Sequence, residues 1–331
     1  MITVGLIGGG GIVTAHLRGY RAHADRIAVT CVSDIVPGVA QARAAELGVP
    51  GYTDFRAMLA REELDAVDIC LPHHLHAEAI AAAAAAGRHV LCEKPLCLTA
   101  EEARSVQQAV RAAGITVMCA HNQLFLPAVA KARELLDSGA IGTLYEVRTT
   151  DCFYNDFDPA TMGWRARSRT SGGGELIDTG YHPTYLLLHL AGAPPLEATA
   201  LLSRHRLSFA EGEDSAQVLV RFANGVVGHL VTSWAYDPPP TTERFMAVGD
   251  QGSLTSDGTE LSVYHRSGAT EHYRFPPVDT FVAEIGHFAD ALIAGTPPLH
   301  TEKEGIEALG MILAAYVGAR TKTFAPVIQA S

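Results

Sequence analysis

Side chains suited to acid–base chemistry occur at two places in this 331-residue sequence. Lys94 lies in a Glu-Lys-Pro run, and Asp178 and His182 lie four positions apart further along the chain. Histidine is suited to proton exchange because its ordinary pKa lies nearest neutrality. A lysine can donate a hydrogen bond to an oxygen on which negative charge develops.

Neither place proves chemistry by itself. Glu-Lys-Pro also suits a solvated strand end, and Asp178 also suits a helix cap followed by a surface His182. If both residues lay on one helix, however, their spacing would put them on one face, from which they could reach a single substrate.

A run of four glycines follows the first apolar segment and indicates dinucleotide binding. Gly8 permits a sharp turn from strand to helix, and Gly10 lets the backbone approach a pyrophosphate bound at the helix N-terminus. Val13 replaces the usual third glycine, which should shift the helix without removing phosphate binding. Asp34 ends the next strand, where it can bind a ribose diol and repel a 2′-phosphate. Since residues 35–37 add no positive charge, we expect NAD rather than NADP.

The elements that must position these residues alternate regularly over the first 120 residues. Strands are expected at 3–7, 27–33, 66–71, 89–92 and 116–119, with helices at 13–22, 39–47, 77–86 and 100–113. Continuously apolar strands separated by helices predict a parallel sheet covered on both faces, which is a doubly wound α/β fold.

The pattern changes after residue 121. A helix at 127–138 is followed by β-like segments at 143–149, 196–203, 216–222, 226–234, 243–249, 253–256, 261–265 and 271–275, and then by helices at 282–294 and 303–319. These segments predict an antiparallel or mixed sheet with few helices. We therefore expect two domains, 1–121 and 122–331.

The overall composition narrows the class of partner. Lys and Arg number 25 against 36 Asp and Glu, and the net charge of −11 argues against nucleic acid and anionic membranes. A small-molecule partner fits better. The first residues lack a basic region and a cleavage site, so we expect a soluble, cytoplasmic protein. The six cysteines include no CxxC pair and are expected to be buried reduced thiols.

Taken together and in order, these motifs resemble the glucose-fructose oxidoreductase/inositol dehydrogenase/rhizopine catabolism (Gfo/Idh/MocA) family. The similarity rests on residues 8–12, Asp34, Pro72 with His76, 87–95 and 172–182. It implies an N-terminal Rossmann domain and a C-terminal α/β domain with a large open, mostly antiparallel sheet. It also implies NAD(P)-linked oxidation or reduction at a sugar or cyclitol carbon.

The resemblance also implies roles for individual residues. Lys94 would hydrogen-bond the reacting oxygen, His182 would exchange its proton, and Asp178 would orient that histidine and share the substrate hydroxyls. The cofactor set would be Gly8, Gly10, Gly11, Ile12, Asp34, Leu71, Pro72, His73, His76, Glu93, Lys94 and Asn122. Tyr154, Trp164 and Arg165 would join Lys94, Asp178 and His182 around the substrate.

Some assignments stay open at this stage. His73, His74 and His76 are better explained by a loop beside the nicotinamide than by a metal site, so no metal is expected. Asn122 is as well explained as a turn residue. Arg167 and Arg169 suit a solvated face or recognition of an acidic substrate group. Tyr185 stands where inositol dehydrogenases of the family often have Asp, which argues against an inositol in particular.

Two other functions remain possible for such a chain. One is a glycoside-cleaving enzyme in which bound NAD is reduced and regenerated, so that NADH does not accumulate. The other is a non-catalytic regulator related to the galactose-pathway repressors, which would not need Lys94, Asp178 and His182. The family resemblance further implies a homodimer or homotetramer.

Overall fold

The computed structural model describes residues 1–329, which form two compact units. The first unit contains residues 1–122 and 279–305, and the second contains residues 123–278 and 306–329. The sequence predicts 122–331 as one domain, but the chain returns to the first unit through α9 (Thr280–Ala294). Gly19 permits this return, because a Cβ there would lie 2.5 Å from Cγ1 of Ile285 on α9.

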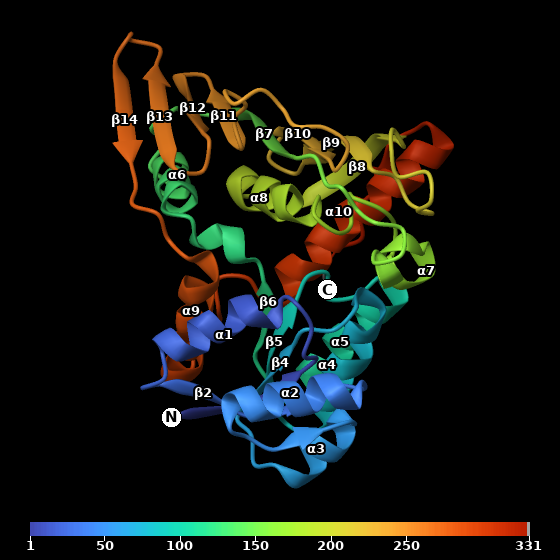
Figure 1. The fold of residues 1–331 in the computed structure, drawn as a ribbon. Helices are drawn as coiled ribbons and strands as arrows, with labels where there is room; N and C mark the ends of the chain where they lie inside the picture. The colour runs from blue at the N-terminus through green and yellow to red at the C-terminus, as the bar shows by residue number, and fades with distance from the viewer. Residues whose placement is uncertain (330–331) are drawn as a thin grey trace. The chain divides into compact units, whose positions relative to one another are not determined.

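The first unit is built on a six-stranded sheet in which every strand pair is parallel. Its strands are β1 (Ile2–Ile7), β2 (Ile27–Ser33), β3 (Gly51–Tyr52), β4 (Ala66–Ile69), β5 (His89–Glu93) and β6 (Val117–Ala120). They lie in the order β3-β2-β1-β4-β5-β6, the doubly wound order of a Rossmann fold. Figure 1 labels β2, β4, β5 and β6 of this sheet. The predicted fold class is therefore confirmed.

Helices connect these strands, and their ends have clear sequence causes. They are α1 (Val13–Ala22), α2 (Pro37–Leu47), α3 (Phe55–Arg61), η1 (His73–Leu75), α4 (His76–Ala85) and α5 (Ala100–Ala113). Thr99 and Glu102 form a capping box at the start of α5, and Gly114 ends that helix in the left-handed conformation. Helix α3 has only seven residues, too few for a periodic pattern, and the sequence analysis missed it.

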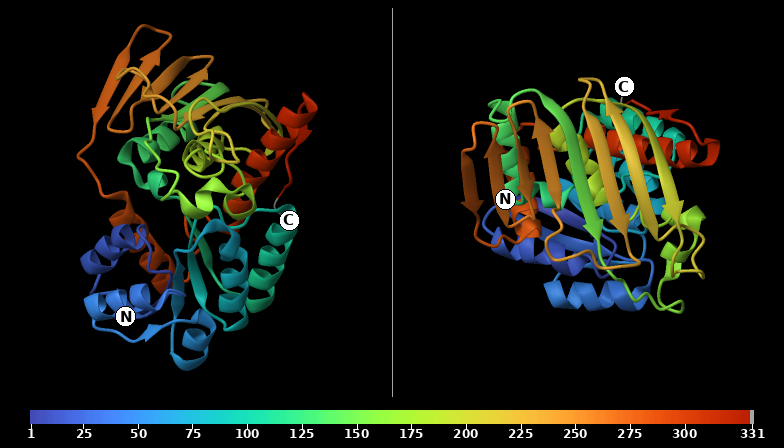
Figure 2. Two further views of the ribbon diagram at one scale, coloured as in Figure 1. Left: turned by 45° about the vertical axis from the view of Figure 1, so that its right-hand side comes forward. Right: turned by 90° about the horizontal axis from the view of Figure 1, so that it is seen from above.

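The second unit contains a nine-stranded sheet, which Figure 2 shows from above in its right-hand view. Its strands are β7 (Leu144–Cys152), β8 (Pro195–Ser203), β9 (Ser215–Phe222), β10 (Val227–Ser233), β11 (Phe245–Gly249), β12 (Gly252–Ser256), β13 (Glu260–His265), β14 (Thr270–Arg274) and β15 (Ala325–Pro326). The order is β14-β13-β12-β11-β7-β10-β9-β8-β15, and β7 with β10 form the parallel pair. The predicted mostly antiparallel sheet is confirmed.

Helices cover one face of this large sheet. The helical segments assigned wholly or partly to this unit are η2 (Asn122–Phe125), α6 (Pro127–Asp137), η3 (Gly163–Ala166), α7 (Ser168–Ser171), α8 (Tyr181–Ala191) and α10 (Glu302–Thr321). Along β9, Val218 and Val220 are buried whereas Leu219 between them is 44% exposed, as expected when one face alone meets the core. Helix α8 is apolar almost all round, so it lacks the amphipathic pattern that reveals a helix in sequence.

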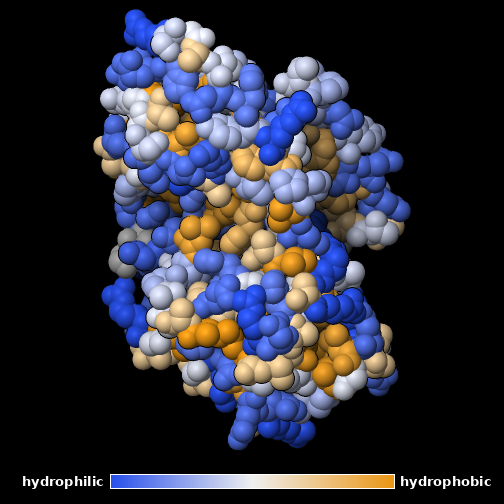
Figure 3. Space-filling model, turned by 90° about the vertical axis from the view of Figure 1, so that its left-hand side faces the viewer, coloured by the Kyte–Doolittle hydropathy of each residue, from blue (hydrophilic) through white to orange (hydrophobic). Residues whose placement is uncertain are grey.

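The predicted buried, reduced cysteines are largely observed. All six cysteines are free thiols; five are buried and Cys152 is partly buried. On the face drawn in Figure 3, hydrophobic side chains form patches among hydrophilic ones. Within the described part of the chain, no helix has the length and apolar character needed to cross a membrane.

Candidate active site

The glycine loop joins β1 to α1 and has room for a ligand. Gly8 has φ 100°, and a Cβ there would lie 2.3 Å from the carbonyl oxygen of Cys70, so the turn requires glycine. At Gly10 and Gly11, by contrast, a Cβ would meet no atom of the described chain within 4 Å. The fold itself therefore does not require glycine at these two positions.

This loop fits the pyrophosphate of a dinucleotide. The space beside Gly10 and Gly11 is open, and the first turn of α1 contains no acidic residue that would repel phosphate. Backbone amides at a helix N-terminus and the helix dipole favour an anion there. Val13, in place of the third glycine, is fully buried, so its side chain is part of the helix–sheet packing.

Asp34 lies beside the loop at the end of β2. Its Oδ2 accepts the Gly9 amide hydrogen at 2.8 Å and its Oδ1 accepts that of Val36 at 2.8 Å. These two bonds hold the carboxylate where the sequence analysis expected a ribose ligand. Arg43 lies over the same loop and donates from Nε to the Gly9 carbonyl oxygen at 3.1 Å. The sequence analysis missed this arginine because it considered only residues 35–37.

Lys94 immediately follows β5, at the edge where parallel α/β sheets bind their ligands. It is partly buried, and its peptide bond to Pro95 is cis. Glu93, which is buried, accepts the Lys94 amide hydrogen through Oε2 at 3.1 Å. Glu93 therefore fixes the backbone from which the Lys94 side chain projects.

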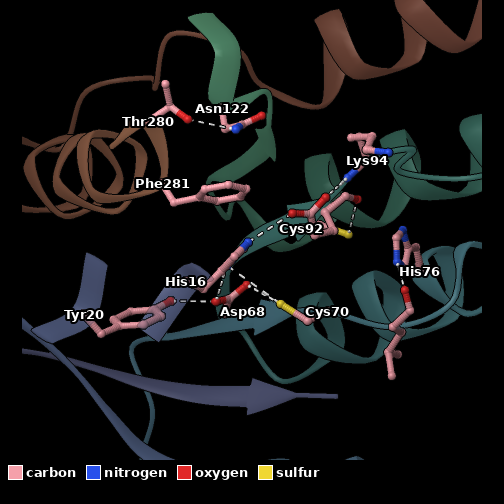
Figure 4. A network of polar contacts seen from close by, with 12 residues as sticks. His16, Tyr20, Asp68, Cys70, His76, Cys92, Lys94, Asn122, Thr280 and Phe281 are labelled. Atoms are coloured by element: carbon pink, nitrogen blue, oxygen red, sulfur yellow. Dashed lines mark hydrogen bonds and ion pairs between the residues drawn. The ribbon is translucent and has the colours of Figure 1, made fainter. Parts of the chain in front are cut away.

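A buried polar cluster contacts Glu93, and Figure 4 shows its members His16, Asp68 and Tyr20. In His16 on α1, Nε2 lies 3.0 Å from Oε1 of Glu93 and Nδ1 lies 2.8 Å from Oδ2 of Asp68. Tyr20 donates its hydroxyl hydrogen to the same Asp68 oxygen at 3.0 Å. Because these bonds join α1, β4 and β5, the cluster ties the Glu-Lys-Pro turn to the helix that follows the glycine loop.

The charge of His16 depends on this cluster. Burial disfavours the imidazolium, but Asp68 and Cys70 outweigh burial and raise the pKa of His16 well above its ordinary value. His16, Asp68 and Cys70 are also close enough together to suggest a metal site. The 2.8 Å contact between His16 and Asp68 shows instead that these side chains are hydrogen-bonded to one another.

The histidines after Pro72 have structural contacts. His76 is buried, with Nε2 2.7 Å from the Leu71 carbonyl oxygen and Nδ1 2.6 Å from that of Pro95. Burial lowers the pKa of His76 although both carbonyls favour its charged form. The ring of the buried His73 lies 6.0 Å from the His76 ring. His76 therefore links the Leu71–Pro72 turn to the Lys94–Pro95 turn within the first unit.

Asn122 lies just after β6 and is buried. Its side-chain amide donates to Oγ1 of Thr280 at 2.9 Å, which joins the end of β6 to the start of α9 (Figure 4). This contact gives Asn122 a structural role in addition to its expected cofactor contact.

In the second unit, Asp178 is paired with Arg165. Nε of Arg165 donates to Oδ2 of Asp178 at 2.7 Å, and Asp178 is only 4% exposed. The guanidinium carbon of Arg165 also lies 4.3 Å from the centre of the Trp164 ring. Trp164, Arg165 and Asp178, which the sequence analysis assigned to the substrate, therefore lie next to one another.

Asp178 lies in a turn and not on the helix that contains His182. Helix α8 begins at Tyr181, so the premise that one helix face presents both residues is wrong. The preceding glycines permit the turn, because a Cβ at Gly174 would lie 2.0 Å from the Glu213 carbonyl oxygen. Trp234 then anchors it by donating from Nε1 to Oγ1 of Thr179 at 2.8 Å.

His182 occupies the first turn of α8 and is partly buried. Its Nδ1 lies 2.8 Å from the hydroxyl oxygen of Tyr185, and the two rings meet edge to face. Tyr185 is completely buried and accepts the Gln123 amide hydrogen at 3.0 Å. The sequence analysis noted Tyr185 only as a departure from the inositol pattern and did not foresee this contact.

Tyr154 is placed in a separate group of the second unit. Its ring lies 3.6 Å from the guanidinium carbon of Arg206, whose guanidinium also donates to the tyrosine hydroxyl. Its backbone amide donates to Oδ1 of Asp237 at 2.9 Å. Tyr154 is half exposed, so it keeps an accessible face.

Two family models match this chain over most of its length. Residues 2–121 match the model described as "Oxidoreductase family, NAD-binding Rossmann fold", and residues 129–255 match the "GFO/IDH/MocA C-terminal domain". The chain belongs to the Gfo/Idh/MocA family of oxidoreductases. Its first unit is accordingly the NAD-binding Rossmann domain of a Gfo/Idh/MocA enzyme.

Individual relatives agree with this assignment. A levoglucosan dehydrogenase of Pseudarthrobacter phenanthrenivorans is 32% identical, with 84% of this chain and 80% of the relative covered. An inositol 2-dehydrogenase of Rhizobium meliloti is 28% identical, with 95% and 96% covered. Among solved structures, a levoglucosan dehydrogenase in complex with NADH and levoglucosan is 27% identical, with a TM-score of 0.89 and 99% and 100% covered. The Gfo/Idh/MocA chain thus resembles named dehydrogenases along nearly its whole length.

Proposed function

We propose that this Gfo/Idh/MocA enzyme transfers hydride between NAD and a secondary hydroxyl or carbonyl carbon of a sugar, sugar derivative or cyclitol. The main support is the position of Lys94, which directly follows β5 at the ligand-binding edge of an NAD-binding Rossmann sheet. The names of relatives that act on levoglucosan and inositol support this substrate class.

The cofactor would be held by the glycine loop and by Asp34. The pyrophosphate would bind at Gly10 and Gly11, where the chain leaves space, and Asp34 would accept hydrogen bonds from the adenosine ribose. Bound NAD would supply the hydride acceptor. We propose that NAD is preferred because the Asp34 carboxylate would repel the 2′-phosphate of NADP. We propose that the other residues of the expected cofactor set also contact NAD. These are Gly8, Ile12, Leu71, Pro72, His73, His76, Glu93, Lys94 and Asn122.

Lys94 and His182 would act on the reacting oxygen of the substrate. Lys94 would donate a hydrogen bond to the oxygen as negative charge develops, and His182 would take the hydroxyl proton during oxidation and return it during reduction. Asp178 and Arg165, which pair with each other, would bind the substrate hydroxyls together with Trp164 and Tyr154. The removal of either Lys94 or His182 should therefore slow hydride transfer more than it weakens cofactor binding.

A substrate screen tests this proposal. Purified protein is incubated with NAD⁺ and with levoglucosan, inositols, D-xylose and L-sorbose in turn, and NADH formation is followed by absorbance. We expect at least one compound to give sustained NADH formation, and Lys94→Ala and His182→Ala to reduce its turnover by about 100-fold or more. Titration with NADH in both variants should still show binding.

Four results would count against the proposal or redirect it. Wild-type turnover in both variants would exclude the assigned roles. Substrate consumption without NADH accumulation would favour the glycoside-cleaving alternative. NADH binding without turnover of any sugar or cyclitol would favour the regulator. Tighter binding of NADPH than of NADH would contradict the proposed role of Asp34.

A further inference from the structure

The hydroxyl of Tyr185 is hydrogen-bonded to Nδ1 of the His182 ring at 2.8 Å. It lies one helical turn after His182 on α8, and its side chain is completely buried. A buried hydroxyl normally has a defined hydrogen-bonding role, because leaving it unpaired costs free energy. The contact with His182 gives the buried Tyr185 hydroxyl such a hydrogen bond.

The Tyr185 oxygen is itself fixed by the backbone. The Gln123 amide donates to it at 3.0 Å, and the Gln123 side-chain oxygen accepts from Nη1 of Arg244 at 2.6 Å. The chain thus runs from Arg244 through Gln123 and Tyr185 to His182, all within the second unit. Such a chain limits the freedom of the partly buried His182 ring.

We propose that Tyr185 is the positioning residue of His182 and selects Nε2 as the nitrogen that exchanges the substrate proton. The hydroxyl oxygen has two lone pairs. One accepts the Gln123 amide hydrogen, and we assign to the second a hydrogen from Nδ1 of His182, which requires the tyrosine to donate its own hydroxyl hydrogen to a third group. The neutral ring then carries its proton on Nδ1, and Nε2 is unprotonated.

This arrangement suits the proposed reaction, on which the mechanistic part of the inference rests. During oxidation the O–H bond of the alcohol would break, its proton would go to Nε2 and the C=O bond would form, with bound NAD supplying the hydride acceptor. The imidazolium produced keeps its Nδ1–H bonded to Tyr185. A hydrogen bond to the charged form favours that form, so Tyr185 also makes His182 a stronger base.

The tautomer can be tested without any substrate. Nitrogen NMR of the full-length protein labelled with ¹⁵N-histidine reports which ring nitrogen carries the proton, and a His182→Gln sample identifies the His182 signals. We expect the Nδ1–H form at high pH in the wild type and a mixture richer in Nε2–H in Tyr185→Phe. Thr184→Val, which removes a buried hydroxyl from the neighbouring position of α8, should leave the His182 signals unchanged.

Kinetics on a compound from the screen supply the functional test. Tyr185→Phe should lower kcat about tenfold while KM changes by less than about threefold, because a positioning residue acts on the reacting histidine rather than on substrate binding. The pKa of the acidic limb of kcat/KM should also fall, since the imidazolium loses its Nδ1 acceptor. Thr184→Val should match the wild type in both respects.

Two outcomes would overturn the inference. If His182 is in the Nε2–H form in the wild type, or if Tyr185→Phe leaves its signals unchanged, Tyr185 does not select Nε2. If Tyr185→Phe keeps the wild-type kcat and pH profile while turning over substrate, its hydrogen bond has no role in positioning. Absence of turnover in the wild type would overturn the proposed function instead, and the NMR result would still decide the role of Tyr185.

Discussion

Arg165 donates its Nε hydrogen to Oδ2 of Asp178 at 2.7 Å, and this bond joins two residues that the sequence analysis had assigned separately to the substrate. The carboxylate is almost completely buried whereas the arginine side chain is 41% exposed. Arg165 therefore orients the Asp178 carboxylate and offsets its negative charge.

Replacing Arg165 with lysine should impair the enzyme. Arg165→Lys keeps the positive charge but loses the planar Nε–H donor, and a hydrogen bond to a charged group is worth enough to lower kcat/KM about tenfold. Steady-state kinetics on a compound from the screen would measure this loss. Arg167→Lys, at an exposed neighbouring position, is the matched control. Equal kcat/KM in the two variants would show that the hydrogen bond from Arg165 to Asp178 does not contribute to catalysis.

Two glycines of the same loop should respond differently to alanine. Gly8→Ala should lower the free energy of unfolding by more than about 1 kcal/mol, because φ 100° and the nearby Cys70 carbonyl both exclude a Cβ. Gly10→Ala should leave stability within about 0.5 kcal/mol of the wild type, since its Cβ would face open space. It should nevertheless weaken NADH binding by occupying that space. Urea unfolding and NADH fluorescence titration separate the two effects, and normal NADH affinity in Gly10→Ala would contradict the placement of the pyrophosphate.

His16 should make stability depend on pH. Its folded-state pKa is raised, so its stabilising contribution is fully present below the unfolded pKa of about 6.5 and is lost as pH rises through the folded value. At pH 6, His16→Gln should cost about 3–5 kcal/mol because it leaves buried carboxylates without their cation. The cost should shrink at alkaline pH.

Tyr20→Phe is the control for His16, because both residues bond to Oδ2 of Asp68. Burial raises the pKa of Tyr20 well above its ordinary value, so Tyr20 stays neutral over this range. Its replacement should cost about 1 kcal/mol at both pH values. A His16→Gln cost that does not change with pH would show that His16 is uncharged in the folded protein.

Glu284 on α9 should destabilise the protein as pH rises. It is completely buried, and neither carboxyl oxygen has a hydrogen-bond partner among the described residues. Burial raises its pKa well above 4.5, so it stays protonated in the folded state while the unfolded state ionises. Glu284→Gln should therefore match the wild type near pH 4 and be more stable at pH 8. Thermal unfolding at both pH values would check this, and a loss of stability at pH 8 would show that the carboxylate is needed.

The parts of the fold that could be predicted are those with strong local patterns. The continuously apolar strands of the first unit and the turn-separated strands of the second were found with boundaries close to those observed. Helix α8 was missed because it is apolar nearly all round, and β3 was missed because it has only two residues. The return of α9 to the first unit depends on packing at Gly19, which no local pattern reveals.

The site shows the same division between local motifs and distant contacts. Lys94, Asp178 and His182 belong to short motifs that can be recognised in sequence. His16 cannot be recognised this way, since its partners Asp68 and Glu93 lie 52 and 77 positions away. Tyr185 depends in the same way on Gln123, which lies 62 positions earlier. Contacts between residues so far apart in sequence arise only when the sheets form.

Direct transfer of hydrogen from substrate to cofactor tests the central claim. A sugar or cyclitol identified in the screen would be prepared with deuterium on the reacting carbon, incubated with NAD⁺ and the enzyme, and the NADH formed would be analysed by mass spectrometry. The account predicts one deuterium in each NADH, formed rapidly by the wild type and slowly by Lys94→Ala and His182→Ala. NADH without deuterium, or equal rates in all three proteins, would contradict it.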